Sequence, residues 1–130
     1  MRALVIDDSS AMRRIISGIL RSVGFDTAEA CHGRDALTKL GPPGAFDLAL
    51  VDWNMPEMNG LEFVQAVRAD PSNDALRIMM VTTESDAGQV LRALEAGANE
   101  YTMKPFDRGI LLSKLELLGL TAPIGREVTP

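Results

Sequence analysis

Acidic, hydroxyl and basic side chains directly follow four short apolar runs of the sequence. Such runs are typical of buried strands, and the carboxyl ends of parallel strands meet at one edge of a sheet, where ligands collect. We therefore expect carboxylates, hydroxyls and one ammonium to converge at this edge. They are Asp7 and Asp8 after residues 3–6, Asp52 after residues 46–51, Thr82 and Thr83 at the end of the run from residue 77, and Lys104 after residues 99–103.

Three carboxylates at one edge repel one another, and Lys104 neutralises only one of their charges. A divalent cation is the natural remedy, because Mg²⁺ prefers oxygen ligands, binds through one or two carboxylates and keeps several waters. A carboxylate held beside Mg²⁺ and a lysine is able to attack phosphorus and form an acyl phosphate. Lys104 and the Thr82 hydroxyl are placed to hold the oxygens and the charge that this adds.

The elements that position these side chains alternate along the chain. Strands are expected at residues 3–6, 25–30, 46–51, 77–82 and 99–103, and helices at 12–23, 34–40, 61–69, around 90–94 and at 110–118. Five strand–helix repeats predict an α/β fold, a doubly wound five-stranded parallel sheet with helices on both faces.

Helical spacing identifies the faces that these helices bury. One buried face is predicted for the first helix and one for the fourth. Ser9 or Ser10 is expected to cap the start of the first helix, and Gly24 suits its end. Asn59 is expected to cap the third helix. The face of the first helix comprises Met12, Ile15, Ile16, Ile19, Leu20 and Val23, and that of the fourth comprises Val90, Leu91 and Leu94.

The composition fits one soluble domain. The chain has 130 residues, of which 46% are hydrophobic and 24% charged, so we expect a domain over residues 1–120 and a disordered tail over 121–130. A net charge of −5 argues against nucleic acid as a partner. The start resembles no secretory signal, and no stretch reaches the roughly 20 apolar residues of a membrane span. A cytoplasmic protein is expected.

The motifs DDSSAMRR, DWNMPEMNGLEF, MVTTE and AGANEYTMKPF, in this order, resemble the receiver domain of two-component response regulators, and specifically its single-domain chemotaxis (CheY-like) type. The resemblance covers residues 4–118. It implies the flavodoxin-like strand order 2-1-3-4-5, an arrangement for which this family is itself the standard example.

The resemblance also implies a role for each site residue. It makes Asp52 the phosphoacceptor, Asp8 a direct Mg²⁺ ligand and Asp7 a ligand acting through water. The backbone carbonyl of Asn54 is a further ligand, and Lys104 pairs with the phosphoryl group.

A conformational switch is implied as well. Thr82 hydrogen-bonds the phosphoryl group and Tyr101 turns inward, which alters the face formed by the fourth helix, fifth strand and fifth helix. Pro105 follows the lysine, often after a cis bond in the family. The implied partners are a histidine kinase or phosphotransfer protein and a downstream protein target. The chain is expected to be a monomeric signalling phosphoacceptor, not an enzyme with a separate substrate.

Three positions tune the lifetime of the phosphoryl group in the family. Asn54 and Glu84 match the short-lived chemotaxis pattern, but Thr83 stands where a small residue is common and is expected to slow both entry and hydrolysis. The fourth helix begins near Asp86 instead of the lysines common in chemotaxis relatives. A stand-alone phosphorelay or adaptor role therefore stays open beside the flagellar one.

Three other classes compete with this interpretation. A Mg²⁺-dependent phosphohydrolase with an aspartate nucleophile needs a second acid two residues later, and Asn54 cannot transfer that proton. A flavin module of similar topology needs a phosphate cradle after the first strand, where Asp7 and Asp8 repel phosphate. A phosphorylation-independent binding module remains, although every reactive position is present.

Several residues have plainer interpretations. Trp53 is expected to be a partly exposed loop aromatic and Cys31 a small buried residue. His32 is expected at the surface of a loop. Arg13 and Arg14 are expected on a solvated helix face, or else on a docking edge for the kinase.

Overall fold

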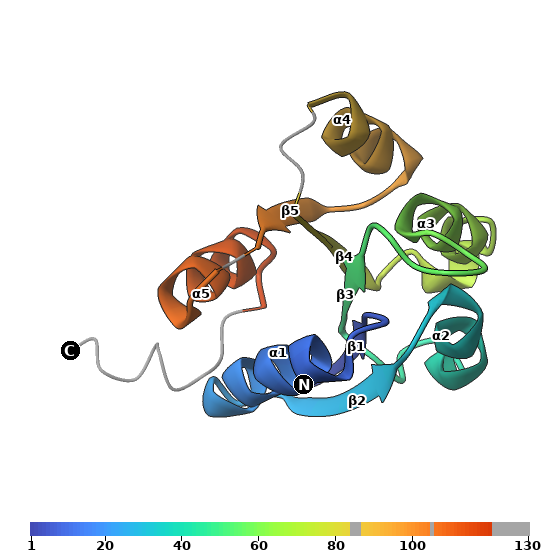
Figure 1. Cartoon of the computed structure of the whole chain (residues 1–130). Coiled ribbons are helices and arrows are strands. Elements are labelled where there is room, and N and C mark those ends of the chain that lie inside the picture. The colour runs from blue at the N-terminus through green and yellow to red at the C-terminus, as the bar shows by residue number, and fades with distance from the viewer. Residues whose placement is uncertain (84–86, 105, 121–130) are drawn as a thin grey trace.

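Figure 1 shows the computed structural model of the chain, which describes residues 1–83, 87–104 and 106–120. All neighbouring strands are parallel, and they form a five-stranded sheet in the order β2-β1-β3-β4-β5. The α/β class and the flavodoxin-like order are both confirmed. The strands are β1 (Arg2–Ile6), β2 (Asp26–Ala30), β3 (Leu48–Asp52), β4 (Arg77–Thr82) and β5 (Glu100–Met103). The helices are α1 (Ser10–Ser22), α2 (Gly33–Leu40), α3 (Gly60–Arg68), α4 (Ala87–Ala96), α5 (Arg108–Leu117) and the short 3-10 helix η1 (Pro71–Asn73).

Helices cover both faces of the sheet. In Figure 1, α1 and α5 lie on one side of the strands, and α2, α3 and α4 lie on the other. Alternate residues of each strand point to opposite faces. In β3, for example, Leu48 and Leu50 pack with α1 and α5, whereas Ala49 and Val51 pack with α2 and α3. The sheet is therefore held between two apolar layers, which fixes the positions of the strand ends.

Polar side chains cap the helices that flank the strand ends. Ser9 accepts a hydrogen bond from the backbone of Met12 and caps α1, and Asn59 forms a reciprocal capping box with Glu62 at the start of α3. Ser9, one of the two predicted caps of α1, and Asn59, the predicted cap of α3, are thus confirmed. His32 caps α2 by accepting from the Asp35 N–H at 3.1 Å. It is thus a half-buried structural residue and not a plain loop residue.

The predicted buried faces of α1 and α4 are wrong at three positions. Ile15 is 56% exposed, Leu91 57% and Leu94 38%. In α4 the residue that packs into the core is Ala93, and Leu91, two positions earlier, lies on the opposite side of the helix. The apolar spacing did not reveal which of several apolar stripes meets the sheet.

The environments of Trp53 and Cys31 differ from those expected. Trp53 is only 8% exposed and belongs to the core cluster beneath α2 and α3, because the turn after β3 carries its ring inward. Cys31 is exposed just beyond β2, with its Sγ 3.6 Å from Asp35 Oδ2. Neither environment follows from residue type alone.

Some predictions fall outside the described residues. Glu84, Asp86, Pro105 and the tail 121–130 lie there. The proposed domain boundary after residue 120 coincides with the end of the described residues and stays a prediction. Among the helices that the structure does describe, none has both the length and the hydropathy that a membrane span requires.

Candidate functional site

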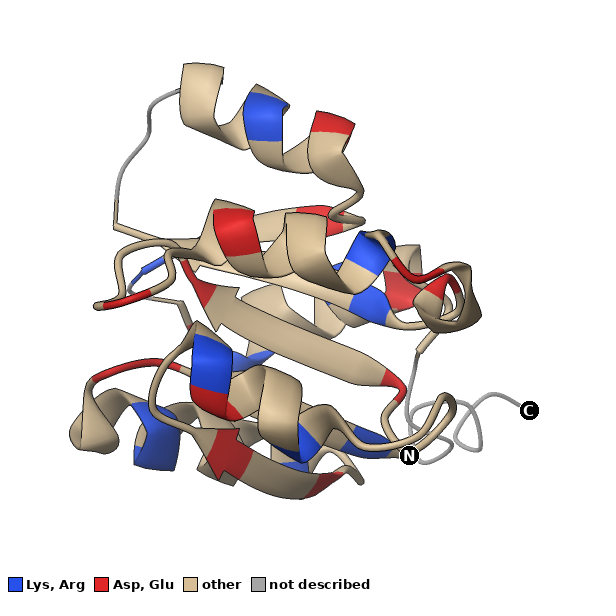
Figure 2. Ribbon diagram, turned by 90° about the vertical axis from the view of Figure 1, so that its right-hand side faces the viewer, with Lys and Arg blue, Asp and Glu red and all other residues tan. Residues whose placement is uncertain are grey.

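The predicted site residues meet at the carboxyl edge of the sheet. Ile6 of β1 lies beside Val51 of β3, so Asp7 directly follows β1 and Asp52 ends the neighbouring strand β3. Oxygen atoms of Asp7, Asp8 and Asp52 all lie within 4.8 Å of one another. Figure 2 shows acidic and basic segments close together at the edge toward which the strand arrows point. The convergence expected from the strand ends is present.

Lys104 binds two of these carboxylates. Its Nζ lies 2.9 Å from Asp7 Oδ2 and 3.4 Å from Asp52 Oδ1. The three side chains are 12%, 2% and 10% exposed, respectively, so the contacts are shielded from water. Lys104 reaches this position because its own N–H donates to the Thr82 carbonyl at 2.7 Å, which ties the end of β5 to the end of β4.

Burial and charge perturb both partners. Burial, together with the negative charge of Asp7, raises the pKa of Asp52, and the nearby ammonium of Lys104 only partly offsets this. Burial opposes the charge of Lys104, but its hydrogen bond to Asp7 and the charge of Asp52 outweigh that effect and raise the pKa of Lys104. The site therefore combines one ammonium, whose charged form its neighbours favour, with more carboxylates than this ammonium neutralises.

This donor set fits a hard divalent cation. Three carboxylates lie close enough to share one ion, and the exposed Asp8 leaves the cluster open on its solvent side. Oxygen ligands of this number and charge suit Mg²⁺, which keeps part of its water shell. Burial and then repulsion from Asp7 raise the pKa of Asp52, and an added cation would relieve the repulsion.

Two neighbours that the sequence did not identify fix Asp7. The Ser9 N–H donates to Asp7 Oδ1 at 2.9 Å, and Arg13 Nη1 donates to the Asp7 carbonyl at 2.7 Å. Arg13 Nε also pairs with Glu29 at 3.0 Å. Arg13 is therefore half-buried and holds Asp7 in place, and it does not lie on a solvated face. Arg14, in contrast, is exposed. An Asp followed two residues later by Ser is a turn signature, and it was the available signal for the Ser9 contact.

The loop between β3 and α3 is tied down at both ends. The Trp53 N–H donates to the Val81 carbonyl at 3.2 Å, and the Gly60 N–H donates to the Trp53 carbonyl at 2.9 Å. Asn54 lies exposed between these ties, next to the carboxylate cluster in sequence. These two hydrogen bonds restrain the backbone that follows Asp52, where Asn54 lies.

The start of α2 supports the far side of the same loop. His32 Nε2 lies 3.4 Å from Glu57 Oε2, and Glu57 has a positive φ of 66°. The side chain of Met58 packs so closely on Gly33 that a Cβ there would lie 2.8 Å from Met58 Cγ. No local pattern signals this support, because it joins segments 25 residues apart.

The residues of the expected switch lie along β4 and β5. Thr82 is 5% exposed at the end of β4, paired in register with Met103, and Thr83 is exposed just beyond it. Tyr101 is half-buried and packs against the core cluster under α3 and α4. Thr82 is therefore at the acidic site, whereas Tyr101 lies farther back along β5.

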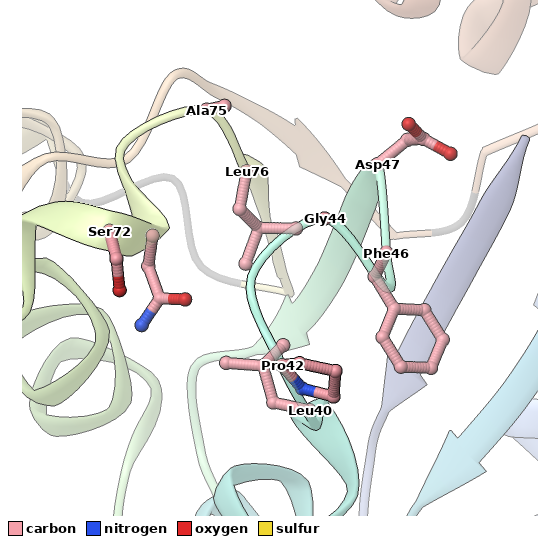
Figure 3. A pocket seen from close by; sticks show the side chains of 9 residues that line it. Leu40, Pro42, Gly44, Phe46, Asp47, Ser72, Ala75 and Leu76 are labelled. Carbon is pink, nitrogen blue, oxygen red and sulfur yellow. The ribbon is translucent and has the colours of Figure 1, made fainter.

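An apolar cavity of about 90 Å³ lies elsewhere, near the amino end of β3. Figure 3 shows Leu40, Phe46 and Leu76 among its lining side chains, with Asp47 at its rim. Asp47 precedes Asp52 by five residues of extended chain, a span of roughly 16 Å. The cavity is thus separate from the acidic cluster.

Comparisons with known proteins agree with one another. The model of the response regulator receiver domain matches residues 3–116. Chemotaxis protein CheY1 of Helicobacter pylori (strain J99) is 47% identical over 119 residues, covering 91% of this chain and 96% of that protein. CheY of Pseudomonas aeruginosa is 46% identical over 117 residues, covering 89% and 94%. The structure of CheY4 of Vibrio cholerae is similar with a TM-score of 0.83 and 35% identity, covering 90% and 97%.

Proposed function

The chain belongs to the response regulator receiver family, and from that premise we propose that Asp52 is the residue that accepts the phosphoryl group. The chain is a phosphoacceptor response regulator of the chemotaxis type, which is a signalling domain. The observation that carries the assignment to Asp52 is its position: a buried carboxylate that ends β3 within the acidic cluster, with Lys104 Nζ 3.4 Å away. We propose that the chain does not act as an enzyme on a separate substrate.

Transfer requires Asp52 to act as a nucleophile. A carboxylate oxygen of Asp52 attacks the phosphorus of the donor, the bond between phosphorus and the donor breaks, and its electron pair leaves with the donor. Lys104, whose raised pKa keeps it charged, neutralises part of the negative charge on the transferred group. The Thr82 hydroxyl at the neighbouring strand end serves as a hydrogen-bond donor to the new oxygens.

Asp7, Asp8, Asp52 and the carbonyl of Asn54 are proposed to hold Mg²⁺. The three carboxylates supply the close oxygen set, and the tied loop after β3 keeps Asn54 beside it. When bound, the ion supplies positive charge that balances the carboxylates and the phosphoryl oxygens. Asn54, Thr83 and Glu84 are proposed to set the lifetime of the phosphoryl group.

We propose that α4, β5 and α5 form the surface that changes on phosphorylation and binds the downstream target. Phosphorylation draws Thr82 toward the new oxygens, and Tyr101 responds by turning inward, as a shift between existing states. Among the described residues, seven large apolar side chains are exposed, and five of these belong to the three elements, namely Leu91, Leu94, Met103, Ile110 and Leu117. Exposed apolar side chains in such numbers favour a protein target.

We propose a histidine kinase or phosphotransfer protein as the donor, and a monomeric receiver as the form that docks to the target. The relatives named for chemotaxis make a chemotaxis target the first to test. The acidic balance of the chain, −5, disfavours nucleic acid as that target.

The buried Trp53, next to the acceptor, allows a direct test. Mg²⁺ and then acetyl phosphate are added while tryptophan emission is followed, and protein-bound phosphate is measured by intact mass and by its sensitivity to hydroxylamine, which cleaves acyl phosphates. We expect metal-dependent quenching, then a second change with one phosphoryl group bound per chain. Asp52→Asn should bind none.

The control is Asp47→Asn, which removes a carboxylate that directly precedes β3, at the end opposite Asp52. It should be phosphorylated like the native chain, because Asp47 contacts the Arg2 N–H at 2.9 Å and not the cluster. Equal hydroxylamine-sensitive phosphate in native and Asp52→Asn protein would show that Asp52 is not the acceptor.

A further inference from the structure

An ammonium group covers the ring of the only tyrosine. Lys114 Nζ lies 4.8 Å from the centroid of the Tyr101 ring. A cation within about 6 Å of a ring centroid is attracted by the negative face of the ring. Lys114 lies in α5 and Tyr101 in β5, so the contact joins a strand to the helix that follows it.

Glu100 holds this ammonium in place. Its Oε1 lies 3.3 Å from Lys114 Nζ and also accepts from the Tyr101 N–H at 2.9 Å. The side chains of Lys114 and Glu100 are only 25% and 18% exposed, so water screens this pair less than an ordinary surface pair. One carboxylate therefore links the backbone of Tyr101 to the cation over its ring.

We propose that Glu100 and Lys114 are positioning residues for Tyr101. The pair holds the ring in the orientation seen here, and so sets how readily the ring moves when the acidic site is phosphorylated. The second half of this statement rests on the proposed function; the first half, the restraint of the resting ring, does not.

The direction of the effect follows from the geometry. If the ring turns away, it leaves the ammonium, which cannot follow without leaving Glu100. The pair thus favours the resting orientation. A modest restraint is sufficient, because allosteric coupling between sites is itself small, typically about five- to 150-fold in affinity. Weakening the restraint should make the switch respond more completely to the same signal.

The single tyrosine makes the resting state measurable. In protein labelled with isotope at tyrosine, one spin system gives the three-bond Hα–Hβ couplings, which report the side-chain rotamers of Tyr101 and not its electrostatic surroundings. Lys114→Met keeps the apolar stem and removes the charge. We expect the ratio of other rotamers to the native one to rise about two- to fivefold, the effect of losing one partly exposed cation–π contact.

Two further variants and a control sharpen this arm. Lys114→Arg restores a cation over the ring and should restore the native couplings. Glu100→Gln should move the couplings in the same direction as Lys114→Met. Lys39→Met breaks another lysine–carboxylate pair, Lys39–Asp35 at 3.0 Å in α2, and should leave the tyrosine couplings unchanged. Native couplings in Lys114→Met, or an equal change in Lys39→Met, overturn the proposal.

A second arm separates this inference from the proposed function. Mg²⁺ with beryllofluoride, a non-covalent mimic of a phosphoryl group, should shift the tyrosine couplings in native protein, and shift them further in Lys114→Met at equal occupancy. If beryllofluoride leaves the tyrosine couplings of native protein unchanged, the proposed switch is wrong. The couplings of the resting proteins still test whether Glu100 and Lys114 restrain the ring. If it responds and Lys114→Met responds identically, the link between the pair and the switch is wrong.

Discussion

Asp52 experiences opposing influences that define its chemistry. Burial and the charge of Asp7 disfavour its ionised form, whereas Lys104 at 3.4 Å favours it. The first two prevail and raise its pKa. The charged, nucleophilic form is therefore held at some cost in the folded chain, and any added positive charge at the cluster relieves that cost.

This balance predicts that Asp52→Asn stabilises the metal-free protein near neutral pH. A carboxyl group whose pKa is raised on folding contributes stability at low pH, and this contribution is lost as the pH rises through the raised pKa. At neutral pH the ionised Asp52 therefore destabilises the fold, and the neutral amide does not. Thermal unfolding in chelator should show a higher midpoint for Asp52→Asn.

The same comparison at low pH provides its check. Below the ordinary carboxyl pKa of 3.8, Asp52 is protonated in both states, so the advantage of the amide should shrink. Asp47→Asn should show no gain at neutral pH. A lower midpoint for Asp52→Asn in chelator would mean that the pairing with Lys104 outweighs burial and repulsion.

The element that places Asp52 is the β3–α3 connection, and Gly60 at its end is the tightest point. A Cβ on Gly60 would lie 2.7 Å from the Asp52 carbonyl oxygen and 3.1 Å from Trp53 Cα. Both of these are backbone atoms, so α3 must approach the end of β3 without a side chain at this position. The close approach also explains how the Gly60 N–H reaches the Trp53 carbonyl at 2.9 Å.

Gly60→Ala is predicted to destabilise the fold by about 1–3 kcal/mol, because the overpacked connection must shift. The same shift moves Asp52, so Mg²⁺ affinity measured through Trp53 emission should fall as well. Gly18→Ala is the matched control, since Gly18 lies in α1 with nothing within 4 Å of its Cβ position. That change should stabilise the helix by about 0.5–1 kcal/mol. Equal Mg²⁺ affinity in both variants would contradict the role of Gly60.

At the scale of the whole molecule, the repulsion among the three acids depends on folding, because the sheet between the two helical layers is what brings them together. The three acids are carried by the ends of β1 and β3, which are buried in both core clusters. The cluster exists only when these strands are paired, so a cation that binds it binds the folded chain and not the unfolded one.

Mg²⁺ should therefore protect the chain against urea. At one hundred times its dissociation constant, the ion should add about 2.7 kcal/mol to the free energy of unfolding, with an unchanged urea dependence. Asp52→Asn should show a smaller gain. Sodium chloride at the same ionic strength is the control, and an equal gain with that salt would show general screening instead of a site.

The sequence by itself determined the order of strands and helices and the polar residues at the strand ends. Apolar runs that end in Asp7, Asp52 and Lys104 are local patterns, and parallel pairing brings their ends together whatever the details of packing. The starts of α1 and α3 were local as well, because Ser9 and Asn59 cap the residues that follow them.

Only the tertiary structure decided which apolar and polar side chains meet across the chain. It buried Trp53, exposed Cys31 and Leu91, and placed Lys114 over Tyr101. The physical reason is that burial and contact depend on which helix face docks on the sheet and on how loops close. Those choices are made by packing between segments that are distant in sequence, and no local pattern records them.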